Sequence, residues 1–211
     1  MAKNQRADFD RRIGRLQASV AKQNLDAMLV MTGVHRFYLT GFRSTMGLLI
    51  VEPDDRPRLL VDARYHEMAR KEIPEVRAER ITQPGEALAR LAEKRKWKRV
   101  GFEGQISTRE LAMLQKAAPN VEQWQDAGGL IEDLRVVKSR SEQAILRRAE
   151  HLGDAVFQKT IAEVRPGMSE WDIRRILRRW IDEMDAEGES FDCIVSAGNN
   201  SSKPHAHVTD R

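Results

Sequence analysis

The sequence predicts an α/β domain with a mixed sheet over residues 1–128, followed by a differently patterned region. Three observations predict this. Short apolar runs alternate with helical stretches in the first part, a turn-forming segment at 53–57 separates two of those runs, and two long amphipathic stripes follow Gly129. The 211 residues are 41% hydrophobic and 32% charged, which excludes a collagen-like or wholly disordered chain.

The first helix and the first strand have distinct patterns. Phe9, Ile13, Leu16 and Val20 recur at the spacing of one helix face, so a packing helix is predicted there. The apolar run 25–31 has the length of a buried strand, and Gly33 marks a turn after it.

A hairpin is predicted next. The segments 47–52 and 58–62 are apolar and of strand length, and between them lie Pro53, two aspartates, an arginine and Pro57. Two strands joined by so short a connection pair in antiparallel fashion, so we expect an antiparallel pair inside the sheet.

Strands and helices then alternate to the end of the first domain. Pro84 and Gly85 open one helix, and Ser107 with Glu110 forms the capping box of another. The predicted elements are a helix over 64–72, a strand over 76–81, a helix through Leu88 and Leu91, a strand over 100–102, a helix through Leu111 and Leu114, and a strand over 121–124. Alternation after a hairpin predicts a mixed sheet covered by helices.

The second region has a helical texture. Residues 129–138 are predicted to form a linker or short bridging helix, and 139–211 a separate domain. A long helix is expected from Ser139 until Pro166 breaks it, and a second from Ser169 to near Gly188. Residues 190–196 are predicted to form a strand, 198–204 a loop, and 205–208 the start of another strand.

Composition and missing motifs exclude several classes. A net charge of +4 is mild, and the basic runs at 94–99 and 174–179 suit a helix end and a solvated helix face, so no nucleic-acid partner is expected. The apolar runs are too short to span a membrane. Cys193 is the single cysteine, which suits a reducing compartment and predicts a cytoplasmic protein. Zinc-finger, P-loop and dinucleotide-binding motifs are lacking.

Histidines are the candidate functional residues. His205 and His207 are two positions apart, so both side chains would face the same side of a strand, next to a loop rich in glycine and asparagine. Two histidines alone do not make a metal site, and such a pair is also compatible with no function. His35 follows Gly33 and is placed in a loop mouth or a simple turn.

Several segments together form one set of motifs. In the first part they are 37–42 (FYLTGF), 47–51 (GLLIV) and 60–65 (LVDARY). In the second part they are 135–139 (RVVKS) with Glu142, 167–170 (GMSE), 190–201 (SFDCIVSAGNNS), Pro204 with His205, and 209–211 (TDR). In this order and spacing they resemble the creatinase, prolidase and Xaa-Pro aminopeptidase family of pita-bread metallopeptidases, over essentially the whole chain.

The resemblance implies an α/β N-terminal domain followed by a truncated α+β pita-bread catalytic domain. It also implies hydrolysis of the peptide bond before proline at two divalent metal ions, Mn, Co or Zn, and a homodimer. The family's metal ligands would follow the segment that ends at Arg211, so this chain is expected to bind no metal and to be inactive by itself.

The resemblance also suggests site residues. His205 matches the histidine that contacts the substrate or the tetrahedral intermediate, and it is the expected catalytic residue. Phe191, His205, His207 and His35 are the expected substrate-binding residues; relatives often carry Asn or Asp in place of His35, near a partner subunit's site. Two alternatives remain: a non-catalytic dimerisation or interaction module, and a creatinase-like amidinohydrolase fragment.

Overall fold

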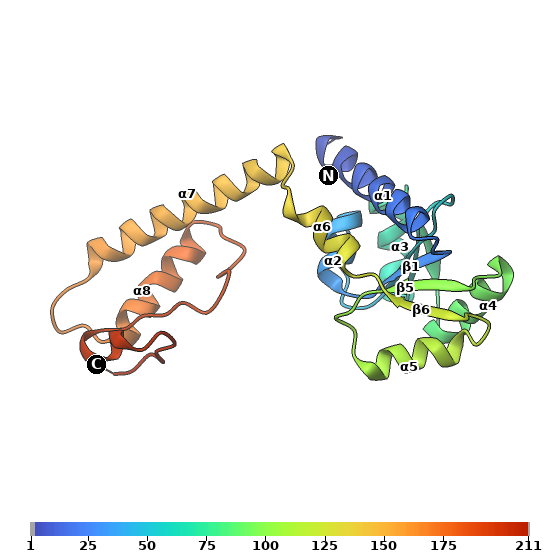
Figure 1. Cartoon of the computed structure of the whole chain (residues 1–211). Helices are drawn as coiled ribbons and strands as arrows, with labels where there is room; N and C mark the ends of the chain where they lie inside the picture. The colour runs from blue at the N-terminus through green and yellow to red at the C-terminus, as the bar shows by residue number, and fades with distance from the viewer. Residues whose placement is uncertain (1–2, 211) are drawn as a thin grey trace. The chain divides into compact units, whose positions relative to one another are not determined.

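The chain divides into two compact units, Met1–Ser139 and Arg140–Arg211, and the computed structural model describes residues 3–210 (Figure 1). No helix within the described residues is long and apolar enough to cross a membrane.

The first unit is built on a six-stranded mixed sheet. Strand β2 is antiparallel to both of its neighbours, β1 and β3, and all other strand pairs are parallel. The order across the sheet is β4-β3-β2-β1-β5-β6. The strands are β1 (Ala27–Val30), β2 (Leu48–Val51), β3 (Arg58–Val61), β4 (Arg77–Arg80), β5 (Arg99–Phe102) and β6 (Gln123–Asp126). The predicted mixed sheet and the predicted antiparallel hairpin of β2 and β3 are both confirmed.

Helices cover both faces of this sheet (Figure 1). Helices α1 (Lys3–Lys22), α2 (Gly33–Thr40), α3 (Ala63–Glu72) and α6 (Gly129–Val136) pack on one face, and α4 (Pro84–Arg95) and α5 (Thr108–Ala117) on the other. Because side chains alternate along a strand, Met28 and Val30 of β1 enter one core, whereas Ala27 and Leu29 enter the other.

Helix α2 differs from the sequence prediction. A turn was expected after Gly33, but α2 forms there, and the helix N-cap Thr32 makes no capping bond with its own side chain. The carboxylate of Glu103, after β5, accepts hydrogen bonds from the backbone N–H groups of Met31 and Thr32 instead. Of the two predictions for 129–138, a linker or a short bridging helix, the structure shows the helix, α6, whose Ile131 and Leu134 join the core beside α1.

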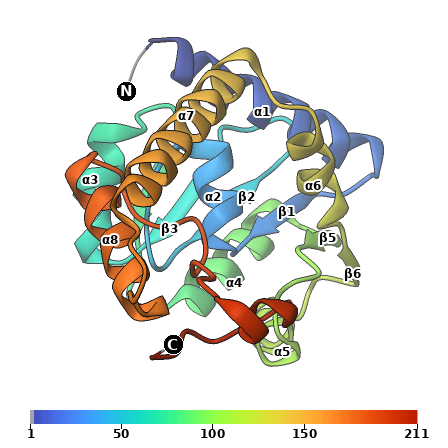
Figure 2. The same ribbon diagram turned by 90° about the vertical axis from the view of Figure 1, so that its left-hand side faces the viewer.

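The second unit contains two packed helices, α7 (Arg140–Glu163) and α8 (Glu170–Glu183), which lie side by side (Figures 1 and 2). Glu163 of α7 accepts a 2.7 Å hydrogen bond from the Trp180 indole of α8. The Lys159 ammonium lies 4.2 Å from the centre of the Trp180 ring, a cation–π contact. A short 3₁₀ helix, Gly198–Ser202, follows in the last segment.

The strands predicted over 190–196 and 205–208 are wrong. Neither segment is a strand, and the described part of the second unit contains no strand with which they could pair. Side chains bind backbone amides in and beside these segments: Glu189 accepts from the N–H of Cys193, and Glu170 from the N–H groups of Ala197 and Thr209, each just after one of the two segments. A strand is stable only when its backbone groups find a partner strand.

We expect residues 1–139 to fold without the second unit. All members of both hydrophobic clusters lie between Ile13 and Leu134, so removal of residues 140–211 takes no side chain from either core. The truncated protein should show one cooperative thermal transition in circular dichroism. Loss of that transition would contradict the independence of the unit.

Candidate functional site

Three of the four residues proposed for substrate binding lie in the last segment of the second unit. The side chain of Phe191 is 76% exposed. His205 and His207 are both exposed, and Ala206 between them is buried. Exposure therefore alternates through this stretch as it would in an extended backbone, although the segment is not a strand.

Helix α8 anchors this segment through Glu170. Ser169 and Asp172 form a capping box that satisfies the start of α8, since each side chain accepts a hydrogen bond from the other residue's backbone N–H. The carboxylate of Glu170 takes no part in this capping box. It contacts the loop of residues 197–209, where it accepts hydrogen bonds from the backbone N–H groups of Ala197 and Thr209, each at 2.7 Å.

Two side chains of the loop complete the contacts of Glu170. The hydroxyl of Thr209 donates a 2.7 Å bond, and the amide nitrogen of Asn200 lies 3.1 and 3.0 Å from the two carboxylate oxygens. The same nitrogen also donates to the backbone carbonyl of His207, at 3.0 Å. Asn200 thus links the anchoring carboxylate to the backbone of a candidate histidine.

The hydrogen bonds define the charge state of Glu170. The bond from the Thr209 hydroxyl, aided by those from Asn200 and the amides of Ala197 and Thr209, lowers the pKa of Glu170 to about 2, against the opposing effect of burial. The carboxylate is therefore ionised at neutral pH. A shallow hollow of about 520 Å³ lies beside it, lined by Asn199, Asn200, Lys203, Thr209 and Asp210.

Acid should release this loop. Because the pKa of Glu170 falls from 4.5 to about 2, its bonds to the loop are complete above pH 4.5 and are lost as the pH falls toward 2. We expect the amide NMR signals of Ala197 and Thr209 to lose their dispersion across that window. In a Glu170→Gln variant, the same amide signals should not change between pH 4.5 and 2. If they titrate as in the wild type, Glu170 is not the group that holds the loop.

His35 lies in the first unit. The sequence prediction of a turn position is wrong, because His35 is on helix α2 and only 1% exposed. Its Nδ1 is 2.5 Å from a carboxylate oxygen of Glu103, whose other oxygen accepts the N–H groups of Met31 and Thr32 at 2.6 and 2.8 Å. Burial opposes the charge of Glu103, but the bonds from His35, Thr32 and Met31 outweigh it and lower the pKa of that carboxyl.

Sequence reasoning assigned no role to Glu103 or Glu170. For Glu103, the usable signal is an acidic residue directly after the buried strand β5, at the edge where β1 also ends. For Glu170, the signal is an acidic residue inside a capping box whose two capping partners are already present. Neither signal identifies the group that the carboxylate contacts.

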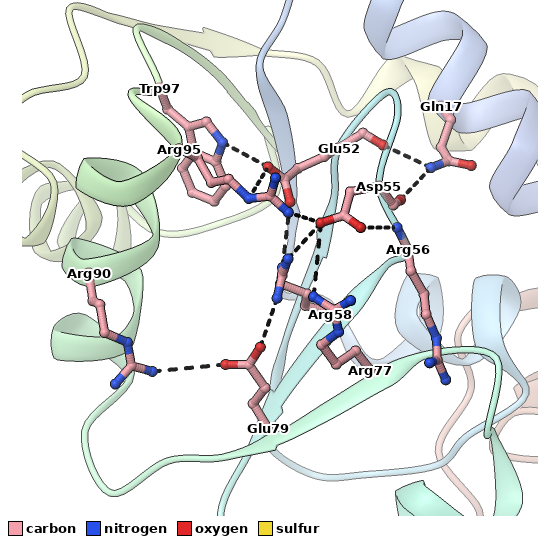
Figure 3. A network of polar contacts seen from close by, with 10 residues as sticks. All are labelled: Gln17, Glu52, Asp55, Arg56, Arg58, Arg77, Glu79, Arg90, Arg95 and Trp97. Atoms are coloured by element: carbon pink, nitrogen blue, oxygen red, sulfur yellow. Dashed lines mark hydrogen bonds and ion pairs between the residues drawn. The ribbon is translucent and has the colours of Figure 1, made fainter.

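A second polar cluster lies in the first unit, around the turn between β2 and β3 (Figure 3). Arg58 is at its centre, within ion-pair distance of Glu52, Asp55 and Glu79. Arg95 pairs with both Glu52 and Asp55. Each carboxylate faces at least one guanidinium group, so the charges of the cluster are paired. The ion pairs connect the turn to β4 and α4, and we interpret the cluster as structural, not as a reactive site.

No metal centre is formed by the described residues. Among residues 3–210, no three His, Cys, Asp or Glu side chains come together in a way that could hold a metal ion. His205 and His207 therefore do not gain the carboxylate neighbours that a two-metal centre needs.

Two family descriptions match the chain. The Creatinase/Prolidase N-terminal domain matches residues 12–137, and Metallopeptidase family M24 matches residues 144–211. An uncharacterized peptidase of Bacillus subtilis is 28% identical over 95% of this chain and 57% of its own length. The chain thus spans a little over half the length of that relative.

Solved structures agree with these matches. An Xaa-Pro dipeptidase from Bacillus anthracis superposes with a TM-score of 0.88 and 25% identity, over 96% of this chain and 57% of its own. The isolated N-terminal domain of a cytoplasmic peptidase from Mycobacterium tuberculosis superposes with a TM-score of 0.54 and 30% identity, over 59% of this chain and 98% of its own.

Proposed function

The chain belongs to the creatinase/prolidase family, and from this premise we propose that it serves the hydrolysis of peptide bonds that precede proline. The observation that carries the proposal is the similarity to an Xaa-Pro dipeptidase across both units, together with the metallopeptidase match over residues 144–211. We further propose a cytoplasmic location, supported by the single cysteine Cys193.

A pair of divalent ions, Mn, Co or Zn, would supply such a peptidase with an activated hydroxide. The described residues do not fit this pair, because no three candidate ligands gather among residues 3–210. We infer that side chains other than the described ones bind the metals, and we assign no metal-dependent step to this chain.

The proposed contribution of this chain is to contact the substrate. His205, exposed on the anchored loop, would donate a hydrogen bond to the scissile carbonyl oxygen as negative charge develops there. His207 and Phe191, also exposed, would line the path of the proline-containing peptide. His35 has weaker support as a substrate residue, since its buried ring and its bond with Glu103 favour a role in fixing helix α2.

The test has two parts. The coding sequence beyond Arg211 is determined, and the protein with any continuation is assayed for metal-dependent cleavage of Ala-Pro, with Ala-Ala as the matched control. We expect release of proline from Ala-Pro alone. Hydrolysis of creatine in place of Ala-Pro would favour the amidinohydrolase alternative, and absence of both activities would overturn the proposal.

The 211-residue chain itself is expected to be inactive. Its purified form should release no proline from Ala-Pro in the presence of Mn²⁺ or Co²⁺, because the described residues bring no ligand set together. Metal-dependent cleavage by this chain would contradict that expectation.

An interaction module is the second candidate. It is favoured by the relative whose N-terminal domain is folded in isolation, with 98% of that domain covered here. We propose that the first unit forms a homodimer, and light scattering coupled to size exclusion measures this directly. A monomer at all concentrations would exclude it.

A further inference from the structure

Glu170 closes the loop that carries His205 and His207. One carboxylate binds the backbone N–H of Ala197 at the start of the loop and that of Thr209 at its end. The residue is 1% exposed, so water does not compete for these bonds. We propose that Glu170 is a positioning residue that holds His205 and His207 in place for the reaction, an inference that rests on the proposed function.

The loop has few other restraints of its own. Its backbone hydrogen bonds join Asn200 to Ala197 and Lys203 to Asn200, within the 3₁₀ turn, and no strand pairing holds the residues that follow. The backbone beside the histidines is held by the Asn200 side chain, whose amide nitrogen donates to the carbonyl of His207. That side chain is in turn held by Glu170.

A carboxylate is the side chain that satisfies this arrangement. All the groups around Glu170 donate: two backbone N–H groups, the amide of Asn200 and the hydroxyl of Thr209. A glutamine would present one N–H₂ group toward donors, leaving at least one buried N–H without an acceptor. We call these contacts of the Glu170 carboxylate the clamp. Glu170→Gln disrupts the clamp with almost no change in side-chain volume.

The contacts of Glu170 order the loop of His205 and His207 before the substrate binds. A histidine on a mobile loop would have to be fixed in every catalytic cycle, and a misplacement of about 1 Å can cost roughly a hundredfold in rate. Lys203 and Asp210, two charged residues that line the adjacent hollow, are both exposed.

The first experiment measures order and does not depend on activity. In the 211-residue chain we expect rigid ¹⁵N heteronuclear NOE values for the backbone amides of 198–208 other than Pro204, and values of a flexible chain in Glu170→Gln. Asp172→Asn is the matched control, because it weakens the capping box of α8 but leaves the contacts of Glu170 in place. Loop order retained in Glu170→Gln would overturn the proposal.

A milder variant guards against misfolding of Glu170→Gln. Thr209→Val removes the hydroxyl donor and keeps both backbone bonds, so it should raise the mobility of 198–208 without lowering the helix content. An unchanged loop in this variant would also count against the clamp.

The second experiment tests whether Glu170 acts on the reaction through His205. In the protein that shows Ala-Pro hydrolysis, we expect Glu170→Gln to lower kcat about tenfold or more while KM stays within about twofold. The double variant with His205→Ala should lose no more than His205→Ala alone. Multiplicative losses of kcat in the double variant would overturn the positioning role. An ordered loop in a wild-type protein without peptidase activity would refute only the proposed function.

Discussion

Replacing Arg58 by methionine is expected to lower the free energy of unfolding of the first unit by about 3–5 kcal/mol. The Arg58 side chain is 8% exposed and donates to Asp55 at 2.6 Å and to Glu79 at 3.0 Å, with Glu52 3.5 Å away. Methionine fills a similar volume but removes the buried guanidinium that three carboxylates share, and the partners that they keep, Arg95 and Arg90, are more exposed. Chemical denaturation of residues 1–139, followed by circular dichroism, measures the loss.

Arg90→Met is the matched control for this prediction. Arg90 belongs to the same cluster (Figure 3), but its side chain is 69% exposed and lies 3.9 Å from Glu79. An exposed pair contributes little, so this change should stay within about 0.5 kcal/mol. Equal losses in the two variants would show that burial of Arg58 is unimportant.

A second substitution should recover part of the loss. Glu52 is buried and also accepts a 3.1 Å bond from the Trp97 indole. Glu52→Gln can keep that acceptor and removes one negative charge, so Arg58→Met should be less damaging in the Glu52→Gln background than in the wild type. Additive losses would argue against electrostatic coupling of these two residues.

Replacing His205 by alanine is expected to lower kcat for Ala-Pro by roughly 10²–10³-fold in the peptidase-active protein. The reason is that a hydrogen bond made only to the developing oxyanion stabilises the transition state more than the bound substrate. KM should therefore change little. Steady-state kinetics with Ala-Pro measures both parameters.

His151→Ala serves as the control for His205. His151 is exposed on helix α7, away from the anchored loop in the chain, and its removal should leave kcat and KM within about twofold. If His205→Ala behaves in the same way, His205 takes no part in catalysis. A rise of KM at constant kcat would instead assign His205 to substrate binding alone.

Much of the first unit could be predicted from the sequence because its signals are local. The spacing of Ile13, Leu16 and Val20 places one helix face in the core, and the capping box of Ser107 and Glu110 marks the start of α5. The hairpin of β2 and β3 follows from two apolar runs and a short turn. Each of these patterns acts over a few residues, so no knowledge of distant segments is required.

The errors arise where a distant residue decides the local structure. Helix α2 differs from the prediction because the amides just before it, those of Met31 and Thr32, bind Glu103, which follows another strand much later in the chain. The segment 190–196 has the composition of a strand, but Glu189 and Arg178 hold its start and Glu170 binds the amide just after it. Composition indicates that a segment can form a strand, whereas pairing decides whether it does.

In the candidate site, too, some features have local sequence signals and others depend on distant residues. Motifs in a fixed order identify the family from the sequence, and the resemblance singles out four residues of interest: His205, His207, Phe191 and His35. The burial of His35 against Glu103, and the bonds of Glu170 to the amides of Ala197 and Thr209, are visible in the folded chain alone. A carboxylate binds whichever donors the fold brings to it, and here those donors are far away in the sequence, so local patterns do not reveal them.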